Sequence, residues 1–166
     1  MVLPIRRFPD AGLKRPTHSV TSIDERHRRL VDRLIVTMRH HPRCVGLAAP
    51  QVGSPLRIAV MESANHPTVT TSQGLIVLVN PRITAREGTT VQREGCLSIP
   101  DLTANVQRAA RVRVRAFNQF GDAQEWRFEG FEAIIAQHEI DHLDGTLFLD
   151  RVANLTTDVF RRKHYG

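Results

Sequence analysis

Two histidines lie four residues apart in the run Gln137-His138-Glu139-Ile140-Asp141-His142, and a glutamate directly follows the first of them. Positions i and i+4 of an α-helix lie on the same face, so a helix over this run would let His138 and His142 bind one metal ion together. Glu139 would then lie beside the metal, where a carboxylate can take a proton from water. The spacing therefore predicts a helical metal site for the hydrolysis of a carbonyl compound.

The same five-residue pattern also occurs by chance on exposed helices, but the flanking residues favour a buried one. Phe131, Ile134 and Ile135 precede the histidines at helical spacing, and Gly145 is a typical helix stop. The histidines therefore lie near the apolar face, where an unpaired imidazole is costly. We interpret the three apolar residues mainly as core, with one side of a substrate pocket as their second role.

A catalytic site of this kind needs a third protein ligand and one open position. The extension to a third histidine is excluded because Phe148 stands at that position, and no glutamate follows Glu139. The remaining downstream alternatives are Asp144, Asp150, Asp158 and His164. Cys96 is the better candidate, because a thiolate suits zinc or ferrous iron and Gly95 allows a close approach of the backbone. A lone cysteine is otherwise most often a small buried hydrophobic residue.

Three segments of the chain together resemble peptide deformylase. They are Gly46-Leu47-Ala48-Ala49-Pro50-Gln51-Val52-Gly53, Glu94-Gly95-Cys96-Leu97-Ser98-Ile99-Pro100 and Gln137-His138-Glu139-Ile140-Asp141-His142-Leu143-Asp144-Gly145. They follow the family's order with similar separations, and the resemblance extends from about Ile5 to Arg151. Three such segments in order are highly specific for this family.

The resemblance implies a catalytic role for each matching residue. The metal ligands would be Cys96, His138 and His142, holding one divalent ion, Fe²⁺ or Zn²⁺. Glu139 would be the general base and acid, and the Gln51 amide and the Leu97 N–H would donate hydrogen bonds to the oxyanion. The implied reaction removes the N-formyl group from N-formyl-methionyl peptides of newly made proteins: metal-bound water attacks the formyl carbon, and formate is released.

The resemblance also implies how the site is supported and how it binds peptide. Glu94 matches a structural carboxylate that pairs with Arg108. The backbone around Val45, Gly46 and Gly95 would bind an extended peptide. The pocket for the methionine side chain would be lined by Val45, Phe131 and Ile134.

Two positions depart from the family pattern. Cys44 stands where many members have glycine, and Thr103 stands where some have arginine. Cys44 would reshape the groove or simply pack in the core, and packing is the favoured interpretation. Two alternatives stay open: a metallohydrolase that acts on another acyl or peptide substrate, and a low-activity binding homologue.

Composition limits the cellular context. A chain of 166 residues is most simply one catalytic domain over residues 1–166. Two cysteines do not make a disulfide framework, and with no apolar signal-peptide core or membrane span we expect a cytoplasmic protein. The formal charge of +6 reflects basic clusters, but no nucleic-acid motif accompanies them, so we expect at most a transient ribosome contact and no sequence-specific nucleic acid. The clusters are Arg26–Arg33, Arg108–Arg115 and Arg161–Lys163.

The hydrophobic pattern predicts an α+β fold, with small antiparallel or mixed sheets packed around a central C-terminal helix that carries the histidines. Ser22 and Glu25 predict a capping box before a helix that includes Leu30 to Met38. Strands are expected over Leu56–Met61, Leu75–Val79 and Arg111–Phe117, with a further strand through Trp126 and Phe128. Asn80-Pro81 and Pro100 should end their segments, and the tail from Val152 should form a short helix.

Overall fold

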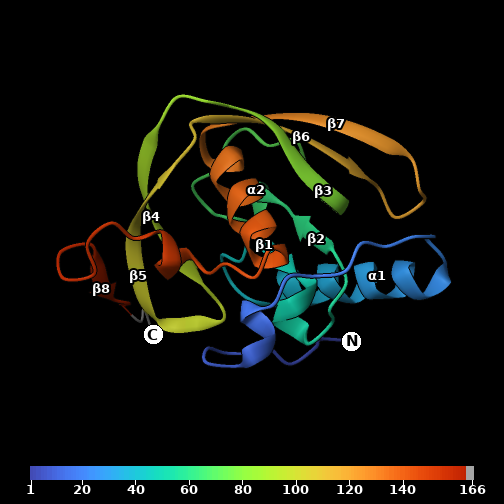
Figure 1. The fold of residues 1–166 in the computed structure, drawn as a ribbon, viewed down its shortest axis with the longest axis horizontal. Coiled ribbons are helices and arrows are strands. Elements are labelled where there is room, and N and C mark those ends of the chain that lie inside the picture. Colours follow the sequence, from blue (N-terminus) through green and yellow to red (C-terminus); the bar gives the residue numbers. More distant parts are fainter. Residues whose placement is uncertain (164–166) are drawn as a thin grey trace.

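The computed structural model describes residues 1–163. Helix α2 (Gly130–Leu143) lies at the centre of the fold (Figure 1). One antiparallel sheet has the order β1 (Gly46–Ala48), β2 (Ile58–Met61), β3 (Ile76–Glu87), β6 (Arg111–Phe117) and β7 (Ala123–Glu129). The other has the order β4 (Thr90–Cys96), β5 (Ile99–Arg108) and β8 (Val159–Arg161). The remaining elements are helix α1 (Glu25–His40) and the 3₁₀ turns Ala11–Lys14, Ala49–Val52, Ser63–Asn65 and Phe148–Arg151. The predicted α+β class is confirmed.

Helix α2 is enclosed because the larger sheet packs against one side of it and the smaller sheet closes another. Every residue from Ala133 to Leu143 is buried, including both histidines and Glu139. The helix contacts β1, β2, β6 and β7 of the larger sheet. Polar side chains inside such a helix must find partners or ligands, because an unpaired buried polar group is costly.

Gly145 ends α2, as the sequence predicts. Its φ angle is +77°, and its N–H bonds to the carbonyl of His142 at 3.2 Å. A Cβ at this position would lie 2.8 Å from the backbone carbon of Arg15, so a side chain has no room. The glycine therefore fixes both the end of α2 and the passage of the N-terminal segment beside it.

Helix α1 covers the other side of β1 and β2 through Val31, Leu34 and Met38, which are buried. The capping box that Ser22 and Glu25 predicted is wrong, because the helix begins two residues later. Asp24 is the N-cap: its carboxylate accepts from the Arg26 N–H at 2.9 Å, and the His27 ring accepts from the Asp24 N–H at 3.0 Å. A histidine thus takes the place that glutamate occupies in the common box.

The strand predicted over Leu75–Val79 does not stop at Asn80-Pro81. It continues to Glu87, with a register shift between Val79 and Arg82. Asn80 has a φ angle of +53°, and its side-chain amide bonds to both the N–H and the carbonyl of Val20, each at 2.8 Å. The bulge accommodates the proline that would otherwise interrupt the ladder.

Strand β6 has the alternation that the sequence predicts. Arg111, Arg113 and Arg115 are exposed, while Val112 and Val114 are buried against α2 and its neighbours. The arginines are therefore a solvated strand face. Arg108 of the same basic cluster is different, because its side chain is buried.

The smaller sheet corrects two further predictions. Pro100 does not end its segment but lies in β5, where pairing with β8 begins only at Leu102. As far as Lys163, the tail beyond Val152 does not form a helix; it forms β8, which pairs with the middle of β5. Among residues 1–163, no helix combines the length and apolar character that crossing a membrane requires.

Replacing Gly145 with alanine is expected to lower the free energy of unfolding by about 3–4 kcal/mol, because left-handed strain adds to a backbone clash. Gly121→Ala is the matched control: its φ angle is +86°, but nothing lies within 4 Å of the added Cβ. The control should cost only about 1–2 kcal/mol. Urea unfolding of both variants measures the difference, and equal losses would contradict the packing argument.

Candidate metal centre

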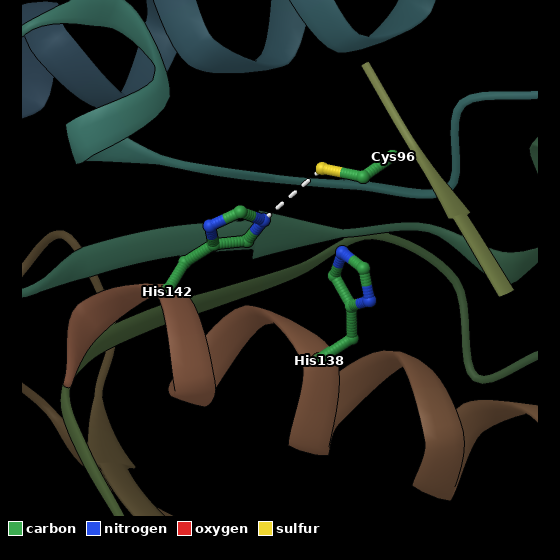
Figure 2. Close-up of side chains that lie close together, drawn as sticks. All are labelled: Cys96, His138 and His142. Carbon is green, nitrogen blue, oxygen red and sulfur yellow. Dashed lines mark hydrogen bonds between the residues drawn. The ribbon is translucent and has the colours of Figure 1, made fainter. Parts of the chain in front are cut away.

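Three side chains from two parts of the fold converge beside α2 (Figure 2). Cys96 is the last residue of β4, while His138 and His142 lie one turn apart on α2. One ligand atom from each lies within 4.8 Å of the others, and Cys96 Sγ is 3.3 Å from His142 Nε2. All three residues are buried. The structure therefore brings together the three ligands that the sequence suggested.

The donor set fits a divalent transition metal. Two ligands of one tetrahedral zinc ion lie about 3.5 Å apart, close to the separation of Cys96 Sγ and His142 Nε2. Burial alone would raise the pKa of the Cys96 thiol, but the charges and hydrogen bonds of His142 and His138 lower it well below its usual value. The thiolate is the form that binds metal.

The downstream alternatives do not join this group. Asp144 caps α2 and pairs with Arg57 at 2.7 Å, and Asp150 pairs with Lys14. Asp158 is not part of the cluster in the described chain, and His164 lies outside the described residues.

A buried chain of charges holds the first histidine. His138 Nδ1 is 2.8 Å from Glu94 Oε1, which leaves Nε2 for the metal. Arg108 donates to both oxygens of Glu94, at 2.8 and 2.9 Å, and also donates to Asp141 on α2. Arg151 closes the chain with two bonds to Asp141, at 2.9 and 2.8 Å. Burial opposes ionisation of Glu94, but Arg108 and His138 lower its pKa to about 2, so it stays charged.

Glu139 lies against the backbone of Gly46. A Cβ on Gly46 would be 2.5 Å from Glu139 Oε2, so only glycine leaves room for the carboxylate. The other oxygen, Oε1, is buried and has no hydrogen-bond partner among the described residues. Burial raises the pKa of Glu139. A carboxylate with one open oxygen and a raised pKa suits repeated transfer of a proton.

Gln51 is held next to Cys96 in the metal centre. Its Oε1 accepts from the Ala48 N–H at 3.0 Å, which orients the amide nitrogen toward the cluster. Nε2 donates to Ser98 Oγ at 3.1 Å and lies 3.4 Å from Cys96 Sγ. Leu97 follows Cys96 in the turn between β4 and β5, and it borders the same space.

A cleft of about 1090 Å³ opens above these residues. One wall carries β1, an edge strand of the larger sheet, and the other carries β4, an edge strand of the smaller sheet. Gly46 and Gly95 border the cleft on these two strands. Edge strands present unpaired backbone groups, so an extended peptide could bind between them.

The apolar residues of α2 line more of the cleft than the sequence predicted. Phe131, Ile134 and Ile135 all line it, together with Val45, which packs against the cluster that contains Ile135. Ile135 also belongs to the core cluster under the larger sheet, whereas Phe131 is 40% exposed. For Phe131, the interpretation as mainly a core residue is wrong, because its ring lies at the mouth of the cleft.

Cys44 both packs in the core and lines the cleft. Its thiol donates to the carbonyl of Gly46 at 3.3 Å. Burial and the nearby charge of Glu139 raise the pKa of Cys44 to about 12, so this thiol stays protonated. Its packing role, favoured from the sequence, therefore coexists with a place in the groove.

Several residues of the site have no clear signal in the sequence. Asp141 does have a signal that could have been used: a carboxylate inside a buried helix needs a cation as its partner. Ser98 lies two residues after Cys96, whereas His66, Phe160 and Arg162 come from segments far from the motifs in the sequence. The residues missed by sequence reasoning are Ser98, Asp141, Arg151, His66, Phe160 and Arg162.

Replacing Arg108 with methionine is expected to lower the free energy of unfolding by about 3–5 kcal/mol, because Glu94 and Asp141 lose the cation they share. Arg115→Met is the control: its pair with Glu125, at 3.2 Å, is exposed and should contribute less than about 1 kcal/mol. Denaturant titration of both variants makes the comparison. A loss as small for Arg108 as for Arg115 would show that the buried network does not stabilise the fold.

Comparison with known proteins agrees with this geometry. The family model described as polypeptide deformylase matches residues 2–158. A relative from Thermodesulfovibrio yellowstonii, named peptide deformylase, is 39% identical over 162 residues, 98% of this chain and 96% of that protein.

Two solved structures give the same result. A peptide deformylase from Thermotoga maritima has a TM-score of 0.83 and 37% identity, covering 93% of this chain and 99% of that one. A Met-Ala-Ser bound class I type b peptide deformylase from Acinetobacter baumannii has a TM-score of 0.85 and 34% identity, covering 91% and 99%. With matching motifs, site geometry and fold, this chain belongs to the polypeptide deformylase family.

Proposed function

We propose that this family member removes the formyl group from peptides that begin with N-formyl-methionine and releases formate. One observation carries the proposal: buried Glu139, with an open oxygen, lies beside the cluster of Cys96, His138 and His142 at the floor of a cleft between two sheet edges. This arrangement combines a metal centre, a base and a peptide groove in one place.

Cys96, His138 and His142 would hold one divalent ion and leave a position open for water and substrate. Their thiolate and imidazole donors suit Fe²⁺ or Zn²⁺. The ion, when bound, supplies a Lewis acid that polarises a carbonyl and lowers the pKa of water toward neutrality. Glu94 keeps the His138 ring in the required tautomer through the 2.8 Å contact to Nδ1.

Glu139 acts as the base in the first step. It takes a proton from the water that attacks the formyl carbon, so a carbon–oxygen bond forms as the carbonyl π electrons move to oxygen. The Gln51 amide and the Leu97 N–H donate to that oxygen; one such donor typically lowers the barrier by about 2.7–4 kcal/mol. Glu139 then gives its proton to the leaving nitrogen as the carbon–nitrogen bond breaks. The products are formate and a free amino terminus.

The cleft gives the peptide its direction. The backbone around Val45, Gly46 and Gly95 would pair with an extended substrate, and Val45, Phe131 and Ile134 would surround the methionine side chain. The related Acinetobacter baumannii structure is described as bound to Met-Ala-Ser, a peptide with the sequence of such a product. Its fold supports the same placement here.

We further propose that residues 1–166 act as one catalytic domain, since both sheets and α2 contribute to the same centre. Two free cysteines, one of them a proposed ligand, favour a reducing cytoplasm. The exposed arginines of α1 favour a transient contact with the ribosome, where new peptides emerge.

Glu139→Gln is expected to retain about one metal ion per chain and to lose nearly all release of formate from N-formyl-Met-Ala-Ser, because an amide cannot take the proton. Cys96→Ala should lose both metal and activity, because a ligand is gone. Metal analysis and formate assay of anaerobically purified protein separate the two roles. Full turnover by Glu139→Gln would refute its role as base, and unchanged metal content in Cys96→Ala would refute its role as ligand.

Cosedimentation with ribosomes tests the proposed contact. Binding should weaken as salt is raised, and replacing exposed Arg26, Arg29 and Arg33 of α1 with glutamine should reduce it further, because the attraction is electrostatic. Absence of binding even at low salt would contradict the proposal.

A further inference from the structure

We propose, on the basis of the deformylase function above, that the cleft favours peptides with an acidic side chain at the second or third residue. Arg162 is the residue that we infer recognises this carboxylate. The argument rests on the register of β8, on the position of the Arg162 guanidinium and on the charges around the cleft.

Strand β8 and the residue that follows it place Phe160 and Arg162 on the cleft face of the smaller sheet. Gly95 pairs with Thr103, and Thr103 pairs with Phe160, so these three positions share one face. Arg162 lies two residues after Phe160 and continues the ladder through a 2.9 Å bond from its N–H to the Asp101 carbonyl. Its side chain therefore lies on the same face.

The guanidinium of Arg162 lies directly over Gly95. Its Nη2 is 3.4 Å from the point where a Gly95 Cβ would be, and Thr103 Cγ2 is 3.5 Å from that point. Gly95 is one of the positions whose backbone would pair with the substrate. When the formyl-methionine of a peptide lies at the metal centre, the residues that follow it would pass beside the Arg162 cation.

The wall around Arg162 is ordered by its neighbours. The Arg93 guanidinium stacks over the Phe160 ring at 3.7 Å from its centroid, and Arg93 Nε also bonds to Asn105 Oδ1 at 3.3 Å. Arg93 is thus held by an aromatic face, whereas Arg162 has no carboxylate partner among residues 1–163. Of these two cations, Arg162 is the one left available to a peptide carboxylate.

Positive charge is not balanced along the outer part of the cleft. The cations that line it are Arg43, Arg93, Arg161, Arg162 and Lys163. The lining carboxylates are Glu94, which is paired with Arg108, and Glu139, which lies at the floor against Gly46. A peptide carboxylate would therefore be attracted, and a lysine at the same position would be repelled.

The test compares four formylated tripeptides with amidated C-termini, so that a carboxylate is present only on the aspartate side chains. The peptides are formyl-Met-Asp-Ala, formyl-Met-Ala-Asp, formyl-Met-Ala-Ser and formyl-Met-Ala-Lys. With metal-loaded protein at low salt, kcat/KM should be about fivefold higher for at least one aspartate peptide than for the lysine peptide, mainly through KM. The ratio should shrink in 0.5 M salt, because the charges at the mouth are solvated.

Substitutions of Arg162 test whether this residue causes the preference for aspartate over lysine peptides. Arg162→Gln should bring the aspartate-to-lysine ratio close to one, and Arg162→Glu should reverse it. Arg86→Gln is the control, since Arg86 is an exposed cation on β3 outside the cleft; it should keep the wild-type ratio. An unchanged ratio in both Arg162 variants would overturn the proposal.

The serine peptide distinguishes a failure of the acidic preference from a failure of the deformylase function. Formate from formyl-Met-Ala-Ser, with equal rates for aspartate and lysine peptides, would reject the acidic preference alone. No formate from any of the four peptides would reject the deformylase function as well.

Discussion

The two-pronged ion pair between Arg108 and Glu94 is the interaction on which the rest of the site depends. Both residues belong to the smaller sheet, yet they reach α2 through Asp141 and His138. The larger sheet, in contrast, holds α2 by apolar packing. Buried charges are tolerated only where partners satisfy them. The ion pair therefore requires one arrangement of its side chains, whereas apolar packing is not directional. The ion pair sets the place of Cys96 relative to the two histidines, because Cys96 lies two residues after Glu94.

The reaction centre and the peptide groove result from the same division into two sheets. Each sheet presents an edge strand to the cleft, and each of these strands has a glycine that lines it. Gly46 makes room for the Glu139 carboxylate, and Gly95 lies under the Arg162 guanidinium. Backbone groups that would be a liability on an open surface are the groups that we propose bind peptide inside the cleft.

The parts of this architecture that depend on local spacing could be predicted from the sequence. The i, i+4 histidines, the stop at Gly145 and the alternation of β6 are all readable within a few residues. Ligand chemistry made Cys96 a candidate, and the motif resemblance settled that choice and supplied Gln51, which no local rule connects to the histidines. Two of the errors share a physical cause: Asn80-Pro81 and the tail beyond Val152 adopt structure through partners far away in the chain. Asn80 bonds to Val20, and β8 forms only because β5 offers an edge. Arg162 enters the cleft by that pairing, so no pattern around it indicates its position.

The metal ligands come from both sides of the boundary between the sheets, with Cys96 on the smaller sheet and the histidines on the helix that packs on the larger one. An ion bound there would be a cross-link as well as a Lewis acid, since it would limit how far the smaller sheet and α2 can move apart. The same movement would change the width of the groove. Occupancy of the two sites is then thermodynamically linked: whatever the ion adds to affinity for peptide, the peptide must add to retention of the ion.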